Sequence, residues 1–413
     1  MKKHNYRAKK VNDINWSLVK ENLAGGAAVL AVDIAKEKQY ALLSTMDNSV
    51  SELWYWNHPE QTREVLAGLE SLRCPLTVVM ESTSTYGDAM RYQFRRSGFD
   101  VDQISAKRVF DAREIYDGVP SLHDAKSVTV IMRLHREGLS KPWRESNANE
   151  RNLDALRREF DLHQSQYLRN QNRLEAYLSR HWPEVLSLLS LDSVTLESLL
   201  INYGTPERIT RQAQEVEQKM RAWGKSQLKD DKIERVLRSA AATLGQPCLD
   251  TERHYLQALA EEMRHNRQQC AYAKQALEAI VNADDGLKEL RLSIGLVTTA
   301  ILLSCRLDPR NYANAHSFHK ALGLNLKEKS SGRYQGQLKI TKRGCSMVRR
   351  YLYFAALRLI KNDPVAKAWY QAKVDARFKN KTVIAVMCKL AKALWYLGRG
   401  ERFDARKLFT VAV

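Results

Sequence analysis

The sequence predicts an α/β domain at the N-terminus, then a helical coiled-coil region, and a mainly α domain at the C-terminus. Between residues 27 and 136, short apolar runs of strand length alternate with helical segments. Apolar residues then recur every seven positions through the middle of the chain, which is the spacing of paired helices. Beyond residue 287, basic helical segments follow a glycine turn.

The predicted domain boundaries follow these changes of pattern. The chain has 413 residues, which fits two or three domains at roughly 150 residues each. Its 44% of apolar residues can bury proper cores. We expect a basic N-terminal tail, an α/β domain, a helical coiled-coil region and a basic C-terminal domain over residues 1–26, 27–145, 146–286 and 287–413, respectively.

The first ordered elements are expected to alternate between strands and helices. Apolar runs predict strands over residues 27–33, 40–44, 53–56, 76–81 and 101–105. Helical patterns occupy residues 59–72, 82–96 and 122–136, where hydroxyl side chains and Gly98 supply cap and stop signals.

Acidic residues end two of the predicted strands and begin a later helix. Asp33 and Glu81 follow apolar runs, and Asp124 lies in the first turn of the helix over residues 122–136. Carboxylates at strand ends open into the crevice where α/β proteins place their sites. Three converging carboxylates provide the oxygen ligands that Mg²⁺ prefers. The alternative interpretation is ordinary, because acids often end strands and cap helices.

Two heptad segments predict long paired helices. One contains Leu153, Phe160, Tyr167 and Leu174, and the other contains Leu256, Met263, Cys270 and Leu277. About 80 residues separate them, so we expect a coiled-coil arm that folds back on itself or pairs with another subunit. A helical bundle is the alternative. His163, Asn170 and Asn266 interrupt the apolar seams, which favours a role in setting the register, and residues 183–250 indicate a small helical subdomain.

Positive charge is concentrated at the C-terminus. The chain has 66 Lys and Arg against 47 Asp and Glu, a net charge of +19. From Lys327 onward there are 21 Lys and Arg against 5 Asp and Glu, so about +16 lies in the last 87 residues. This imbalance favours a polyanionic partner, with nucleic acid as the leading candidate.

Membrane and secreted classes are disfavoured. No apolar stretch approaches the roughly 20 residues that a transmembrane helix needs. The basic first ten residues lack the apolar segment of a secretory signal, so we expect a cytoplasmic protein. Six scattered cysteines without a Cys-x-x-Cys pair predict reduced, unliganded thiols.

A serine in a basic loop is the second candidate for chemistry. Ser330 and Ser331 are flanked by Lys329 and Arg333, and a serine in this setting can attack phosphorus while the cations hold the phosphate. An ordinary Ser-Gly turn is the alternative. Further along, basic residues precede and continue along a predicted helix over residues 347–360, typical of a phosphate-binding helix N-terminus. They are Lys342, Arg343, Arg349 and Arg350.

Six segments together resemble the insertion-sequence 110 family of transposases, in the family's order and across nearly the whole chain. The N-terminal ones resemble its DEDD domain, and the C-terminal ones resemble its serine-containing domain. They are residues 33–36, 81–87, 124–125, 293–300, 330–332 and 340–344.

The resemblance implies a RuvC-like, RNase H-like domain over residues 27–145 and a DNA recombinase related to Piv-type invertases. It implies Mg²⁺ at Asp33, Glu81 and Asp124, and a covalent phosphoserine intermediate at Ser331, with Ser330 as the adjacent alternative. It also implies a structured bridge RNA that pairs with target and donor DNA, and dimers that assemble into a tetramer. A metal-only RNase H-like nuclease and a non-catalytic nucleic-acid-binding scaffold are the alternative functions.

The last acidic motif departs from the family. Its members usually have two aspartates three residues apart, whereas this chain has only Asp124. Ser127 replaces the second aspartate if Asp124 is the first, and Ser121 replaces the first if Asp124 is the second. Asp117 and His123 are neighbouring substitutes outside the motif. The helix–turn motif around Gly295 also lacks the first glycine of the family pattern.

Overall fold

The chain forms two compact units, Met1–Glu145 and Ser146–Val413. The structure is a computed structural model that describes residues 7–82, 85–120, 123–224, 228–328, 331, 336, 338–375, 377 and 379–410. The sequence-based boundary at residues 145 and 146 falls at the same place, whereas the boundary at 286 and 287 lies inside the second unit.

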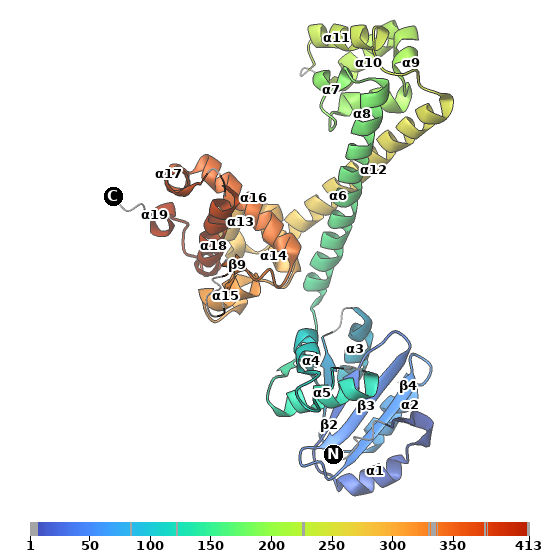
Figure 1. Cartoon of the computed structure of the whole chain (residues 1–413), viewed down its shortest axis with the longest axis vertical. Coiled ribbons are helices and arrows are strands. Elements are labelled where there is room, and N and C mark those ends of the chain that lie inside the picture. The colour runs from blue at the N-terminus through green and yellow to red at the C-terminus, as the bar shows by residue number, and fades with distance from the viewer. Residues whose placement is uncertain are drawn as a thin grey trace. The chain divides into compact units, whose positions relative to one another are not determined.

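A mixed sheet of seven strands forms the centre of the first unit (Figure 1). Its order is β1-β4-β3-β2-β5-β6-β7. Strand β3 is antiparallel to both β2 and β4, β7 is antiparallel to β6, β1 is parallel to β4, and β2, β5 and β6 are mutually parallel. The strands are β1 (Lys9–Lys10), β2 (Ala28–Asp33), β3 (Lys38–Thr45), β4 (Ser51–Asn57), β5 (Leu76–Glu81), β6 (Asp100–Ile104) and β7 (Lys141–Pro142).

Helices pack on both faces of this sheet. Adjacent residues of a strand point to opposite faces, so Val32 and Met80 join the core with α1, α2 and α3, while Ala31 and Val79 join the core with α4 and α5. The prediction of an α/β N-terminal part is confirmed. The helices are η1 (Val11–Asp13), α1 (Trp16–Leu23), α2 (Thr62–Ser71), η2 (Thr85–Gly87), α3 (Asp88–Arg96), α4 (Ala106–Ala112) and α5 (Asp124–Arg136).

Residues 7–26 are folded, unlike the basic tail expected over residues 1–26. Val11, Val19 and Leu23 are buried in the core that α2 also covers. The Trp16 ring lies so close to Gly68 in α2 that a β-carbon there would come within 2.2 Å of it. The spacing of the apolar residues in this segment fits one face of a short helix. Its surplus of basic residues had favoured the prediction of a tail.

Two long helices of the second unit pair with each other in antiparallel directions. The Cys270 thiol of α12 (Asp250–Asn282) lies 3.9 Å from the Phe160 carbonyl oxygen of α6 (Ala148–His181). The buried seam includes the predicted heptad residues Leu153 and Leu277. The helices therefore fold back on each other within one chain, while knobs-into-holes packing and pairing with another subunit stay predictions.

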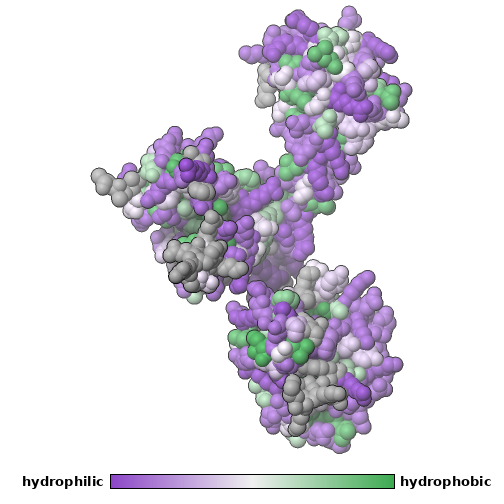
Figure 2. Space-filling view, viewed as in Figure 1, coloured by the Kyte–Doolittle hydropathy of each residue, from purple (hydrophilic) through white to green (hydrophobic). Residues whose placement is uncertain are grey.

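Five shorter helices form a bundle at one end of this helix pair. Their core includes Leu178 from α6 and Met263 from α12. On the face drawn in Figure 2, mostly hydrophilic residues cover this bundle and the two long helices. The helices are α7 (Val185–Leu188), α8 (Val194–Asn202), α9 (Pro206–Arg211), α10 (Ala213–Gly224) and α11 (Asp230–Ala241).

The C-terminal helices form another core at the other end of the pair, which Phe160 and Ala273 share. Within the described ranges, no helix is both long and apolar enough to span a membrane. The elements are η4 (Asp285–Leu287), α13 (Lys288–Ile294), α14 (Leu296–Ser304), η5 (Pro309–Asn311), α15 (Ala315–Ala321), β8 (Leu326–Lys327), β9 (Lys339–Ile340), α16 (Ser346–Asn362), α17 (Pro364–Lys373), α18 (Lys379–Leu397) and α19 (Ala405–Leu408).

Candidate active site

Asp33 and Glu81 lie at the carboxyl ends of two neighbouring parallel strands. β2 and β5 pair in register, with Val32 opposite Met80, so the next residue of each strand is an acid. Both strands are buried on both faces, which explains their nearly continuous apolar sequences. Each run ends in a half-buried carboxylate at the same edge of the sheet.

Helix α5 begins beside this edge. The His123 ring caps the helix by accepting a hydrogen bond from the Lys126 amide, and Asp124 is exposed in the first turn. One turn further, the buried Ser127 side chain lies near the Asp33 carboxylate and lowers its pKa. Ser127 is one of the two positions where this chain departs from the family's paired aspartates, while Ser121 lies outside the described residues.

Burial and mutual repulsion control the ionisation of these acids. Burial is the main cause that raises the pKa of Asp33, and the Asp124 carboxylate adds to it, whereas the Ser127 side chain lowers that pKa. Burial and then the Asp33 carboxylate raise the pKa of Glu81. Asp33 therefore interacts electrostatically with both other acids, and the three carboxylates concentrate negative charge at one edge.

The carboxylate oxygens at this edge of the sheet are ligands that Mg²⁺ prefers. A bound cation would also neutralise their negative charge. The spacing is looser than a bound ion requires. The three carboxylates do not form a group whose ligand atoms all lie within 4.8 Å of one another, whereas two oxygens on one Mg²⁺ are at most about 4.2 Å apart. Binding one shared ion therefore requires at least one side chain to move.

Two neighbouring charged residues have structural partners. The Arg91 side chain, 3% exposed, donates to the Glu81 carbonyl oxygen at 3.0 Å and pairs with Asp88 at 2.9 Å. The Asp117 carboxylate pairs at 2.8 Å with the buried Lys126 ammonium. Asp117, a candidate substitute for the missing aspartate, is therefore engaged in an ion pair. The sequence analysis missed Arg91, whose position between the apolar Met90 and Phe94 of α3 is the signal that it lies buried.

The predicted serine lies in a hairpin loop of the second unit. Strands β8 and β9 are antiparallel, with Leu326 opposite Ile340. Ser331 is exposed in the loop between them. The neighbouring candidates Lys329, Ser330 and Arg333 lie outside the described residues.

A basic turn connects this hairpin to helix α16. Lys342 and Arg343 are exposed, and Lys342 has a φ of +56°. Gly323 packs so tightly against the Arg343 backbone that a β-carbon would meet the Arg343 carbonyl oxygen at 1.9 Å, so glycine is required there. The turn therefore has a fixed backbone that presents two cations to solvent just before a helix N-terminus.

Arg349 and Arg350 have different surroundings, although the sequence analysis assigned both to nucleic-acid binding. The half-buried Arg349 donates to the carbonyl oxygens of Arg343 and Gly344 at 2.6 and 3.2 Å, so it braces the basic turn. Arg350 is exposed, with its guanidinium 5.9 Å from the Phe354 ring. Arg350 is therefore the one of the two that presents its charge to solvent.

A basic cavity of about 870 Å³ adjoins the hairpin. No acidic residue occurs among the described residues that line it. Burial, followed by Lys392 and His316, lowers the pKa of the His319 ring in its wall to about 4, so this ring is neutral at pH 7 and lysines provide the charge. The lysines are Lys320, Lys339, Lys342, Lys381, Lys389 and Lys392.

A family model described as the IS116/IS110/IS902 family of transposases matches residues 292–371. The matched segment contains the hairpin, Ser331 and the basic turn, whereas Asp33, Glu81 and Asp124 lie outside it. No curated protein matches the chain. The family match supports an IS110-family transposase, and hence transposase or recombinase function with DNA as a partner.

Proposed function

We propose that this protein is a bridge-RNA-guided DNA recombinase that cuts and rejoins DNA through a phosphoserine at Ser331. The observation that carries the proposal is the family match over the segment that contains Ser331 and the basic turn. An exposed serine in a basic segment suits attack on a phosphodiester, because cations stabilise the developing negative charge. Lys342 and Arg343 are exposed in the turn that follows the same hairpin.

The first unit would supply an RNase H-like metal site. Its mixed sheet and the carboxylates of Asp33, Glu81 and Asp124 near one edge support this assignment. Mg²⁺ held there would neutralise charge on a phosphodiester undergoing displacement. Ser127, which lies near Asp33, would take the place of the missing aspartate.

The proposed chemistry conserves the phosphodiester bond energy. The Ser331 oxygen forms a bond to phosphorus while the bond to one deoxyribose oxygen breaks, and the serine proton ends on that leaving oxygen. A deoxyribose hydroxyl of another strand then attacks the phosphoserine, releasing the serine and rejoining DNA. Lys342 and Arg343, in the turn after the hairpin, would hold neighbouring DNA phosphates during both steps.

The RNA guide and the assembly of dimers into a tetramer rest on the family resemblance. The basic C-terminal region supports a nucleic-acid partner, since about +16 of net charge lies in the last 87 residues. The lysines of the basic cavity and the exposed Arg350 would contact phosphate groups.

Recombination in cells tests the proposal. Asp124→Ala and Ser331→Ala should each abolish excision of the element as a circle, while DNA and RNA binding stay close to wild type. Wild-type excision in either variant would remove that residue from the mechanism.

A metal-only nuclease is the second candidate, because the carboxylates belong to one unit and the serine to the other. It requires Asp33 and Glu81 but not Ser331. Strand cleavage that persists in Ser331→Ala and disappears in an Asp33→Ala, Glu81→Ala double variant would favour the nuclease. Unchanged function in the double variant would favour the non-catalytic scaffold.

A further inference from the structure

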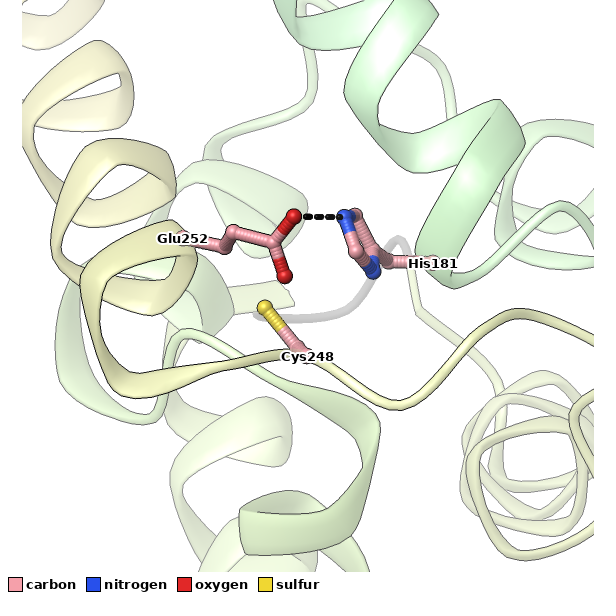
Figure 3. Close-up of side chains that lie close together, drawn as sticks. All are labelled: His181, Cys248 and Glu252. Atoms are coloured by element: carbon pink, nitrogen blue, oxygen red, sulfur yellow. Dashed lines mark ion pairs between the residues drawn. The ribbon is translucent and has the colours of Figure 1, made fainter.

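Three metal-ligating side chains meet at the junction between the helical bundle and the two long helices (Figure 3). They are His181 at the end of α6, Cys248 in the loop before α12, and Glu252 in the first turn of α12. One ligand atom of each lies within 4.8 Å of the other two. Figure 3 shows their side chains converging on one point.

The His181 ring is oriented as a metal ligand. Its Nδ1 atom lies 3.0 Å from the Gln246 carbonyl oxygen, an acceptor that requires the proton on Nδ1 in the neutral ring. The Nε2 atom then has a free lone pair. It is buried without a hydrogen-bond partner in a residue that is 1% exposed. Metal-binding histidines commonly have their second nitrogen fixed by such a carbonyl.

The backbone holds Cys248 close to this ring. Gln246 donates its amide to the Arg180 carbonyl oxygen at 2.8 Å, which joins the loop to the end of α6. Gly245 approaches α6 so closely that a β-carbon would lie 2.2 Å from the His181 carbonyl oxygen. Glu184 fixes the start of the loop by accepting hydrogen bonds from the Leu244 amide and the Thr243 hydroxyl, at 2.8 and 2.7 Å.

Glu252 has one carboxylate oxygen to offer. Its Oε2 atom accepts from the Leu249 amide at 3.0 Å, at the start of α12. Its Oε1 atom faces His181 Nε2 at 3.7 Å. The Arg180 guanidinium, 3.5 Å from Oε1, is the competing cation, and its side chain is 55% exposed and therefore free to turn toward solvent.

We propose that His181, Cys248 and Glu252 bind one Zn²⁺ ion, with water as the fourth ligand. Nitrogen, thiolate and carboxylate ligands suit this borderline-soft ion, whereas Mg²⁺ selects oxygen alone. Ligand atoms around tetrahedral zinc are separated by about 3.3 to 3.6 Å, so small side-chain shifts are sufficient. Binding replaces the thiol proton with zinc and releases that proton to solvent.

The ion would fasten the loop to both long helices. His181 ends α6 and Glu252 begins α12, so one bound ion links the two helices where the bundle joins them. This site is separate from the proposed recombination chemistry, and its test does not depend on DNA or on Mg²⁺. With zinc bound, Cys248 would be the one exception to the expectation that all six cysteines are unliganded.

Cobalt spectroscopy of the metal-free full chain tests the proposal. One equivalent of Co²⁺ should give a thiolate-to-cobalt charge-transfer band, and stoichiometric Zn²⁺ should displace it. Cys248→Ser should lose this band and weaken Zn²⁺ binding at least about tenfold. Cys270→Ser, which changes a thiol of α12 outside the cluster, should keep both.

A second variant separates metal binding from folding. Glu252→Gln keeps an oxygen that can accept the Leu249 hydrogen bond but removes the charge, so its fold should persist while Zn²⁺ affinity falls. In wild type, Zn²⁺ should raise the thermal unfolding midpoint of the full chain, and this rise should shrink in Glu252→Gln. A wild-type chain without the cobalt band, or Cys248→Ser with an unchanged one, would overturn the assignment.

Discussion

The Asp33 carboxylate is destabilising when it is ionised in the folded protein without a cation. Burial and the Asp124 charge raise the pKa of Asp33 above 3.8, so ionisation is harder in the folded chain than in the unfolded chain. This loss of stability is absent below pH 3.8, grows as the pH passes through the raised pKa of Asp33, and is complete above that pKa.

Asp33→Asn should therefore stabilise the protein in the presence of a chelator. Asparagine keeps the shape of the side chain, while the charge is gone. We expect the unfolding midpoint at pH 7 to rise by about 2 °C to 4 °C, which corresponds to about 1 kcal/mol in a domain of this size. The gain should shrink as the pH falls toward 4. An equal midpoint for variant and wild type at pH 7 would contradict this account.

Cys345 should be the most reactive thiol of the six. A hydrogen bond from the Cys305 thiol, with the sulfurs 3.0 Å apart, is the main cause that lowers the pKa of Cys345, and the amides of Met347 and Val348 add to it. Burial raises the pKa of Cys74, Cys248, Cys270 and Cys388, and the pKa of Cys305 is raised by its hydrogen bond to Cys345 and by burial. A thiolate is the form that alkylates.

Mass spectrometry after brief iodoacetamide treatment at pH 7 measures this order. Cys345 should be modified first, and Cys305→Ala should slow its modification severalfold because the donating thiol is lost. Cys388→Ala serves as the matched control and should leave the rate unchanged. Earlier labelling of Cys74 would be the opposite result.

The sequence predicted the chemical character of the candidate residues better than their contacts. Asp33 and Glu81 were identifiable because each ends an apolar run, and neighbouring strands are enough to bring them together. The proximity of Ser127 to Asp33 and the burial of Arg91 depend on how α5 and α3 pack against the sheet. Such contacts join distant parts of the chain, so local spacing alone does not specify them.

A polar pair, one member of which is buried, interrupts the seam between helices α6 and α12. His163 Nδ1 and Asn266 Oδ1 are 2.8 Å apart, and Asn266 is fully buried. Replacing one partner with leucine leaves the other without its hydrogen bond, which typically costs about 1 to 3 kcal/mol.

A double-mutant cycle measures this coupling. His163→Leu and Asn266→Leu should each lower the free energy of unfolding of the helical unit by about 1 to 3 kcal/mol in urea titrations. The double variant should lose less than the sum of the two, since no polar atom of the pair stays unpaired. Strictly additive losses would show that the pair is not coupled.

Helix α16 combines a bracing arginine with a solvent-exposed one. Arg349→Ala should lower the unfolding midpoint, because the carbonyl oxygens of Arg343 and Gly344 lose their donor. Arg350→Ala should leave the midpoint unchanged but weaken DNA binding, and should reduce the slope of log affinity against log salt by about 1. Binding assays at several salt concentrations, together with thermal unfolding, separate the two roles. Equal effects of both variants on stability would contradict the distinction.

Helices with a long apolar repeat in the sequence could be predicted, whereas short helices could not. The heptads around Phe160 and Met263 extend over residues 153–174 and 256–277, so their signal was strong enough to identify both long helices. Helix α1 has only 8 residues, and its basic neighbours outweighed the apolar Val19 and Leu23. A short element is defined mostly by what it packs against, which here is the Gly68 surface of α2.

The two units of the molecule carry different kinds of reactive and charged groups. The first concentrates carboxylates at a sheet edge, and the second presents a serine, a basic turn and a lysine-lined cavity. The family match covers the serine segment alone. The central claim is therefore that Ser331 forms a covalent bond to DNA, with the acids assisting.

Detection of a covalent protein–DNA adduct tests that claim most directly. Cells carrying the complete element with its flanks supply the native RNA, and denaturing extraction removes every non-covalent complex. The account predicts an adduct in wild type and in Ser330→Ala that is absent in Ser331→Ala. Excised circles without an adduct in wild type, or an adduct that persists in Ser331→Ala, would contradict it.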